Sequence, residues 1–182
     1  GSRRYFTIAA SPLEGDLRIG VKFYPDGSSF KRSLLQIQKG DQIVASQLSG
    51  EFTLPKDPGK KLCFIAGGIG ITPFRSMIKY LLDTNQKRDI VLLYSNKTAR
   101  DIVYKEIFDE AFQKLGIKTV YVGTDTMGRL DAAMVKAEVP DFDERTFYIS
   151  GPHSMVDAFE KTLKEMGLHG KQIKVDFFPG YA

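Results

Sequence analysis

The amino-acid sequence predicts an α/β protein in which an open parallel sheet follows a smaller antiparallel β unit. Up to residue 55, short alternating apolar segments are broken by Gly, Pro and Asp, which is typical of short antiparallel strands. From residue 61 onward, apolar runs alternate with longer stretches of helical periodicity, which is typical of a parallel sheet covered on both faces. A Pro/Gly/Lys segment at 55–60 suits a linker, so we expect domains at 3–57 and 61–182.

Each element follows from its local pattern. In the first domain we expect strands at 4–9, 17–23 and 42–46, and a helix at 30–39, where apolar residues recur at helical spacing before the turn at 40–41. In the second domain the apolar runs predict strands at 62–66, 90–94, 119–122, 146–149 and 173–178. The periodic stretches between them predict helices at 73–83, 101–115, 130–138 and 155–166.

Composition and charge limit the possible functions. The 182 residues, 42% of them hydrophobic, suffice for one or two compact domains. The 26 basic and 22 acidic residues are scattered, which gives a nucleic-acid role little support, although a basic surface can attract a dinucleotide phosphate or an acidic redox partner. Cys63 is the only cysteine, which excludes an internal disulfide, a four-thiolate iron–sulfur cluster and a zinc ribbon, and we expect no metal site. Charges and glycines interrupt the apolar stretch 62–82, so it is a poor membrane span, and we expect a cytoplasmic protein.

The strongest local signal is the glycine turn between the strand at 62–66 and the helix at 73–83. Pro73 suits the first helical position and Thr72 suits the N-cap. Such a turn directs free backbone N–H groups and the positive helix end at one point, and glycines let an anion approach closely. A tight turn without a ligand is the alternative, but the strand before it and the helix after it favour a pyrophosphate site formed by Gly67, Gly68, Gly70 and Thr72.

A polar loop ends the second parallel strand, where a dinucleotide fold meets the adenosine ribose. An acid at this point would bond the ribose 2′-hydroxyl, whereas cations would bind a 2′-phosphate. Ser95, Lys97 and Arg100 therefore favour NADPH, while Asp101 would still allow NADH. A solvated polar loop is the alternative interpretation.

The fourth parallel strand ends in a small residue followed by Gly-Pro, which leaves a ledge with room for a flat ring. Ser150, Gly151 and Pro152 form this ledge, and His153 or Ser154 is expected to cap the next helix. Neither of the two histidines has an obvious partner, so we expect surface or capping roles for both, which disfavours an ordinary two-substrate dehydrogenase. The aromatic residues at 177–181 either dock the tail or border a site.

Taken in order, these segments resemble the ferredoxin–NADP reductase superfamily from Arg4 to Tyr181. The resemblance implies a Rossmann-like NAD(P)-binding domain with strand order 3-2-1-4-5, preceded by a flavin-binding β-barrel. The segment 4–7 resembles the Arg-x-Tyr/Phe-Ser/Thr flavin motif, in which Arg4 would meet the flavin phosphate, Phe6 would lie against the isoalloxazine and Thr7 would bond the ring. The segment 27–34 corresponds to a flavin-phosphate site, where Ser29 or Lys31 would make the contact.

The same resemblance assigns the nicotinamide side. The segment 67–73 is similar to the pyrophosphate loop, and 150–155 resembles a Cys-Gly-Pro-x-x-Met motif in which Ser150 replaces the cysteine near the reacting nicotinamide carbon. Asp176-x-Phe178 resembles an acid–aromatic tail, with Phe178 or Tyr181 as the ring that the nicotinamide displaces. Ser150 and Phe178 are therefore expected to border the hydride-transfer site.

The resemblance implies a flavin-dependent NAD(P)H reductase that passes a hydride from NAD(P)H to FAD or FMN and electrons on to an acceptor protein or domain. The alternative is a non-catalytic nucleotide-sensing or electron-transfer subunit of a larger reductase. Members of the superfamily have further barrel strands before the flavin motif, so we expect an incomplete barrel that is completed by an N-terminal segment, by a partner or by a second copy in a homodimer. The cytoplasmic part of a membrane-associated reductase would fit the same pattern.

Overall fold

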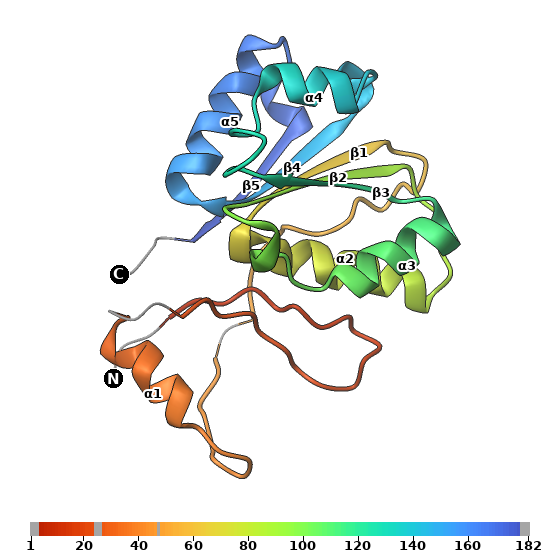
Figure 1. Ribbon diagram of the computed structural model, residues 1–182. Helices are drawn as coiled ribbons and strands as arrows, with labels where there is room; N and C mark the ends of the chain where they lie inside the picture. Colours follow the sequence, from red (N-terminus) through yellow and green to blue (C-terminus); the bar gives the residue numbers. More distant parts are fainter. Residues whose placement is uncertain (1–3, 24–26, 47, 179–182) are drawn as a thin grey trace.

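A five-stranded parallel sheet organises residues 62–178 of the computed structural model, which describes residues 4–23, 27–46 and 48–178. Its strands lie in the order β3-β2-β1-β4-β5 and all four pairings are parallel, which confirms the expected order 3-2-1-4-5 (Figure 1). The strands are β1 (Leu62–Gly67), β2 (Ile90–Asn96), β3 (Lys118–Gly123), β4 (Thr146–Pro152) and β5 (Ile173–Phe178).

The central strand explains why the apolar runs become parallel strands. Every residue of β1 is buried, because helices cover both faces of the sheet and leave no polar face for water. Leu62 pairs with Ile90 of β2 on one side and with Thr146 of β4 on the other. The chain order therefore reverses at β1, and ligands of open α/β sheets bind in the crevice at the carboxyl ends of the strands at such a reversal.

Two helix pairs cover the two faces (Figure 1). The pair α2 (Thr72–Asp83) and α3 (Lys105–Leu115) packs one apolar core, which includes Phe64, Phe74 and Phe108. On the other face lie α4 (Ala132–Glu138) and α5 (His153–Glu165), over a second core that includes Val135 and Phe159. Short 3₁₀ turns complete the unit: η1 (Gly68–Ile71), η2 (Ala99–Asp101), η3 (Phe142–Glu144) and η4 (Gly170–Gln172).

A buried arginine holds together the amino-terminal ends of the strands. The guanidinium of Arg145 donates to the Leu62 carbonyl (3.0 Å), to Asp89 Oδ1 (2.8 Å) and to Asp141 Oδ1 (2.7 Å). Lys61 Nζ lies 3.0 Å from the other oxygen of Asp141. These bonds, above all the one from Arg145, lower the pKa of Asp141 to about 2. They tie the start of β1 to the start of β4, at the edge opposite the glycine turn.

The described residues before β1 contain one helix and very little β pairing. The helix α1 (Ser29–Gln36) confirms the expected helix, and the Ser28 hydroxyl caps it by accepting from the Lys31 amide (3.5 Å). The strands expected at 4–9, 17–23 and 42–46 are wrong for the described residues, where the β pairing before β1 is the single bridge between Ile8 and Ile19.

The missing strands have a simple physical reason. An alternating sequence forms a strand only where a neighbouring strand takes up its backbone hydrogen bonds. In the described residues the segment 42–46 has no such neighbour, and Val44 is fully exposed. The described residues before β1 therefore do not show the expected antiparallel barrel. Among the same described residues, no helix has the length and apolarity that a membrane crossing requires.

Candidate functional site

The glycine turn at the carboxyl end of β1 is tighter than the sequence suggested. Gly68–Ile71 form the 3₁₀ turn η1, which continues without a break into α2 at Thr72. The expected N-cap at Thr72 is wrong, because Ile71 and Thr72 are already helical and the Thr72 hydroxyl donates back to the Ile69 carbonyl (3.1 Å). Pro73 is accordingly the second residue of α2 instead of the first. The turn and the helix still present one continuous N-terminal end toward the sheet edge.

The turn has glycines at its positions for different structural reasons. A Cβ on Gly70 would lie 2.2 Å from the Ser150 carbonyl oxygen, and one on Gly67 would lie 2.1 Å from Met155 Sδ. Gly70 therefore lets the turn pack directly against the end of β4, and Gly67 lets it pack against Met155 of α5. Gly68 has a φ of +53° and open space within 4 Å of its Cβ position, so an approaching ligand can reach its backbone.

The end of β4, which carries the residues of the expected ledge, lies beside this turn. Ser150 is completely buried and pairs with Ala66 of β1 and with Asp176 of β5. Its hydroxyl makes no hydrogen bond of normal geometry with the described residues, although Asp176 is its neighbour in the sheet. A buried hydroxyl that lacks a good hydrogen bond is costly and therefore requires an explanation.

The helix after the ledge begins differently from the prediction. Pro152 occupies the N-cap position of α5 without a side-chain cap, so the expected capping by His153 or Ser154 is wrong. His153 Nδ1 lies 2.8 Å from Asp157 Oδ2, and its ring packs edge-on against Phe177 at 4.6 Å. Because Asp157 is one turn further along the same helix, the histidine is held at the surface. The other histidine, His169, takes the expected capping role, at η4.

The flavin-motif segment contacts the ledge through Thr7. Its hydroxyl donates to Asp176 Oδ2 over 3.3 Å, which brings Thr7, Asp176 and Ser150 into one cluster. Burial raises the pKa of Asp176, and the hydroxyls of Thr7 and Ser150 act in the opposite direction. The backbone of Phe178 pairs with Pro152 in the sheet, while Tyr181 lies outside the described residues.

The two segments expected to hold flavin lie together. The rings of Phe6 and Phe30 stack with their centroids 6.0 Å apart, and the Arg4 guanidinium lies 5.6 Å from the Phe30 ring centroid. Ser29 is exposed on the first turn of α1, and Lys31 is half-buried there. The fold thus brings Arg4, Phe6 and the start of α1 together.

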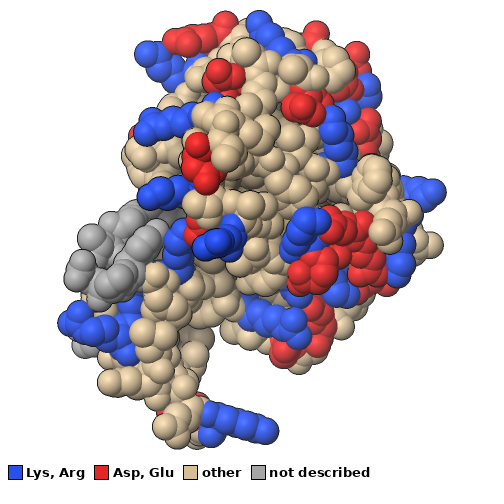
Figure 2. Space-filling model, in the orientation of Figure 1, with Lys and Arg blue, Asp and Glu red and all other residues tan. Residues whose placement is uncertain are grey.

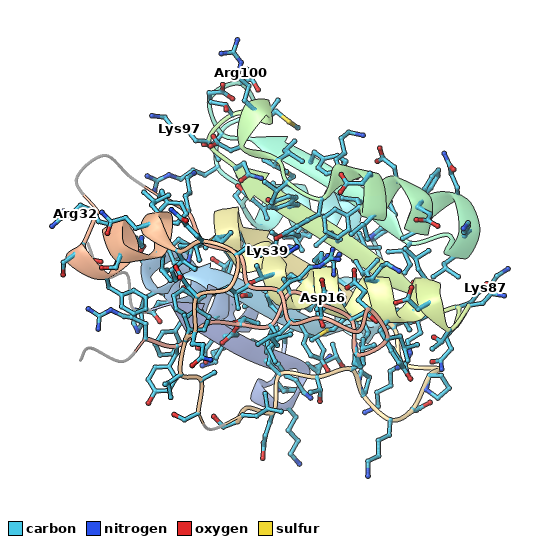
Figure 3. All side chains as sticks on the ribbon, turned by 90° about the horizontal axis from the view of Figure 1, so that it is seen from below. Asp16, Arg32, Lys39, Lys87, Lys97 and Arg100 are labelled. Atoms are coloured by element: carbon cyan, nitrogen blue, oxygen red, sulfur yellow. The ribbon has the colours of Figure 1, made fainter. Side chains whose placement is uncertain are left out.

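At the carboxyl end of β2, the acid that would favour NADH is already engaged. Asp101 Oδ2 accepts from the Thr98 hydroxyl (3.0 Å), and Asp101 Oδ1 lies 3.2 Å from Lys22 Nζ. These contacts, the threonine bond first, lower the pKa of Asp101. Lys97 and Arg100 are exposed and project together from the loop after β2 (Figure 3), while Ser95 is half-buried in the strand.

Sequence reasoning missed the contact between Arg75 and Glu14. Arg75 is only 3% exposed and bonds both oxygens of the Glu14 carboxylate, Oε1 over 2.7 Å. An available signal was a charged residue between Phe74 and Met77 on the apolar face of a helix, which requires a partner once it is buried.

The surface charges show no extended block of one sign. On the face seen in Figure 2, basic and acidic side chains are interspersed.

Comparisons with known proteins agree with this geometry. Residues 64–161 match the family described as Oxidoreductase NAD-binding domain. The glycine betaine monooxygenase reductase subunit of Chromohalobacter salexigens is 29% identical over 176 residues, which cover 90% of this chain and 48% of that protein.

Two solved structures share the fold. The flavohemoglobin of Malassezia yamatoensis with bound FAD and heme has a TM-score of 0.74 at 24% identity, covering 96% of this chain and 46% of that one. A mutant ferredoxin-NADP+ reductase of Plasmodium falciparum in complex with 2′P-AMP has a TM-score of 0.76 at 22% identity, covering 95% and 75%. The chain spans about half the length of the curated relatives that it matches, such as 48% of the reductase subunit.

Proposed function

The chain belongs to the oxidoreductase NAD-binding domain family, and from this premise we propose that it is the nucleotide-binding part of a flavin-dependent NAD(P)H reductase. Family membership and the shared fold also confirm the resemblance to the ferredoxin–NADP reductase superfamily. In the proposed reaction, NAD(P)H reduces a bound flavin, and the flavin passes electrons to an acceptor protein or domain.

One observation supports this function most. The glycine turn, the buried Ser150 and the flavin-motif residue Thr7 meet at the carboxyl ends of β1, β4 and β5, where the strand order reverses. A dinucleotide that crosses this edge would place its diphosphate at the turn and its nicotinamide on the ledge. The segment that carries Thr7 would then present a flavin to that ring.

Each group of predicted residues has a role in this proposal. The backbone at Gly67, Gly68, Gly70 and Thr72 would hold the pyrophosphate, since Gly68 is open to an approaching anion. Ser95, Lys97 and Arg100 would bind the adenosine ribose and its 2′-phosphate. Gly151 and Pro152 would support the nicotinamide, with Ser150 beneath it and Phe178 beside it. Asp101, the acid that would bond the ribose 2′-hydroxyl of NADH, is already held by Thr98 and Lys22. For this reason we favour NADPH.

The residues of the N-terminal segment fit a flavin. The stacked pair Phe6–Phe30 lies beside Arg4 and the start of α1, and a cation together with a helix N-terminus suits a phosphate. Arg4, Ser29, Lys31 and Tyr181 would hold the cofactor, with Thr7 oriented toward its ring by Asp176. When bound, the flavin supplies the hydride acceptor, and the chain supplies orientation and exclusion of water.

Residues 3–57 would form part of a flavin-binding barrel, and residues 61–182 the NAD(P) domain. The described segments between residues 4 and 48 are mostly irregular outside α1 and expose large apolar side chains: Tyr5, Leu17, Ile43, Val44 and Leu48. Such surface is normally covered in a folded protein. Further strands from the same protein or from a second copy would complete the barrel.

The visible spectrum of the purified protein, supplied with FAD, tests this function. We expect flavin absorption bands that bleach under anaerobic conditions when NADPH is added, and more slowly with NADH. Calorimetry should detect binding of the oxidised dinucleotide to the same material. Dinucleotide binding without any flavin band would favour the alternative, a nucleotide-sensing subunit, and no binding of either ligand would refute both.

A further inference from the structure

Arg75 is buried at the start of the helix that follows the glycine turn, yet its partners belong to the N-terminal segment. Besides both oxygens of Glu14, its guanidinium donates to the Ala9 carbonyl oxygen (2.9 Å). The face of the same group lies 5.5 Å from the Tyr104 ring centroid. The planar fork of an arginine can bind both oxygens of a carboxylate and also donate to a carbonyl in a fixed geometry, which the single ammonium nitrogen of a lysine does not reproduce.

Further contacts hold the same short segment against α2. Ala9, Ala10 and Ser11 are almost completely buried. Ser76 Oγ donates to the Ala10 carbonyl (2.6 Å), and Ser11 Oγ donates to Asp83 Oδ2 (2.7 Å). The segment is therefore fixed along nearly the full length of α2, with Arg75 nearest the glycine turn.

Residues 18–20 of the N-terminal segment run back past Ala9 and contact the glycine turn. Ala9 N donates to the Arg18 carbonyl (2.8 Å), beside the bridge between Ile8 and Ile19. A Cβ on Gly20 would lie 2.5 Å from Thr72 Cγ2, so this chain packs directly on the first residue of α2. The flavin-motif residue Thr7 stands only two residues before Ala9, a reach of about 7 Å in an extended chain.

We infer that Arg75, with Glu14 as its counter-ion, is a positioning residue that fixes the flavin-binding segment relative to the nicotinamide ledge. This role rests on the proposed reductase function. Hydride transfer requires the two rings at a near-attack distance, and a displacement of about 1 Å can cost on the order of a hundredfold in rate. The latch, defined as Arg75, Glu14 and the Ala9 carbonyl, connects the two ring sites through a short path: α2 to the glycine turn on one side, and Ala9 to Thr7 on the other.

The positioning role predicts different effects on the rate of hydride transfer and on dinucleotide binding. The two apolar cores of the sheet are built from buried residues between Leu62 and Leu168, and neither includes the latch. Loosening the latch should therefore leave the dinucleotide site intact. It should slow hydride transfer, because the flavin segment would sample more positions.

The test compares Arg75→Lys with Arg145→Lys in the flavin-loaded protein. Arg145 is a matched control, since it too is a buried arginine that binds a backbone carbonyl and carboxylates, but at the opposite edge of the sheet. For Arg75→Lys we expect the rate of flavin bleaching at saturating NADPH to fall on the order of tenfold, with the dinucleotide Kd unchanged within about twofold. Hydrogen exchange at the amides of residues 8–11 should increase, while exchange in β1 and β4 stays as in the wild type. Arg145→Lys should lower Tm without this pattern.

Each outcome decides the question. Unchanged bleaching in folded Arg75→Lys overturns the positioning role, even if exchange at residues 8–11 increases. Equal loss of rate in Arg145→Lys at matched stability also overturns it, because the effect would then be general destabilisation. Absence of flavin reduction in the wild-type protein is a different result, since it refutes the proposed function itself.

Discussion

Thr7 and Asp176 stand 169 positions apart in the chain and are joined by a hydrogen bond of 3.3 Å from Oγ1 to Oδ2. The bond connects the N-terminal segment to β5, the edge strand of the sheet, directly beside the buried Ser150. The candidate site therefore depends on contacts between the two ends of the sequence.

Asp176 gives this cluster a defined pH dependence. Because burial raises the pKa of Asp176 above its ordinary value of 3.8, the unfolded chain ionises first as the pH rises. Its contribution to stability is thus fully present at low pH and is lost as the pH rises through the folded-state pKa. Asp176→Asn should remove this slope, so that the variant gains stability relative to the wild type with increasing pH in urea unfolding. A stability difference that stays constant with pH would contradict this assignment.

The open glycine of the turn should matter for binding more than for stability. Gly68→Ala places a methyl group where an anion would approach and also costs roughly 1 kcal/mol, because φ is positive. Gly116→Ala is the matched control, since Gly116 has a φ of +74° and equally open space, but lies at the end of α3. We expect calorimetry to show about tenfold weaker dinucleotide binding for Gly68→Ala alone, since an anion held by backbone N–H groups must approach closely. Equal affinities in the two variants would argue against a pyrophosphate at this turn.

Gly70 should behave in the opposite way. An alanine Cβ would lie 2.2 Å from the Ser150 carbonyl oxygen and 2.6 Å from the Gly151 amide nitrogen, both backbone atoms of a buried strand. Because neither atom can move without displacing β4, we expect Gly70→Ala to lower the free energy of unfolding by about 2 to 4 kcal/mol. Thermal unfolding followed by circular dichroism measures this loss. A stable Gly70→Ala protein would mean that η1 is less tightly packed against β4.

The cations after β2 should set the preference between coenzymes. Under the proposed function, Lys97→Ala and Arg100→Ala should each raise KM for NADPH by about five- to tenfold, through loss of a charge-assisted bond to the 2′-phosphate. KM for NADH should change by less than about twofold. Lys87→Ala provides the control, because Figure 3 shows Lys87 as a cation at the far end of the molecule from Lys97 and Arg100. If the two coenzymes are affected equally, the 2′-phosphate lies elsewhere.

The amino-edge network predicts acid sensitivity. Since Arg145 and Lys61 lower the pKa of Asp141 to about 2, its stabilisation is present above 3.8 and is lost as the pH falls toward about 2. Asp141→Asn should therefore destabilise the protein at neutral pH by about 1 to 2 kcal/mol, a value that allows for partial solvent screening. The difference from the wild type should shrink steadily below pH 3.8 and become small near pH 2 in urea unfolding. A difference that persists there would show that the asparagine disrupts packing instead of charge.

Much of the fold was predictable because its signals are local. Strand β1 is a run of six buried residues, and the helices between strands have apolar periodicity that marks their inner faces. The same reasoning placed the glycine turn and the Ser150 ledge at one end of the sheet, since the carboxyl ends of parallel strands lie together. It did not predict that η1 would replace the N-cap at Thr72, because that depends on how closely Gly70 can approach β4.

By itself, the sequence determined the five strands, their covering helices and the edge at which the glycine turn would lie, because burial on both faces selects continuous apolar runs. Only the tertiary structure decided which distant residues meet. The bond from Thr7 to Asp176 and the latch between Arg75 and Glu14 leave no periodic trace in the chain. The segments at 4–9 and 17–23 alternate like strands, yet within the described residues they share one bridge, because a strand exists only where a partner accepts its hydrogen bonds.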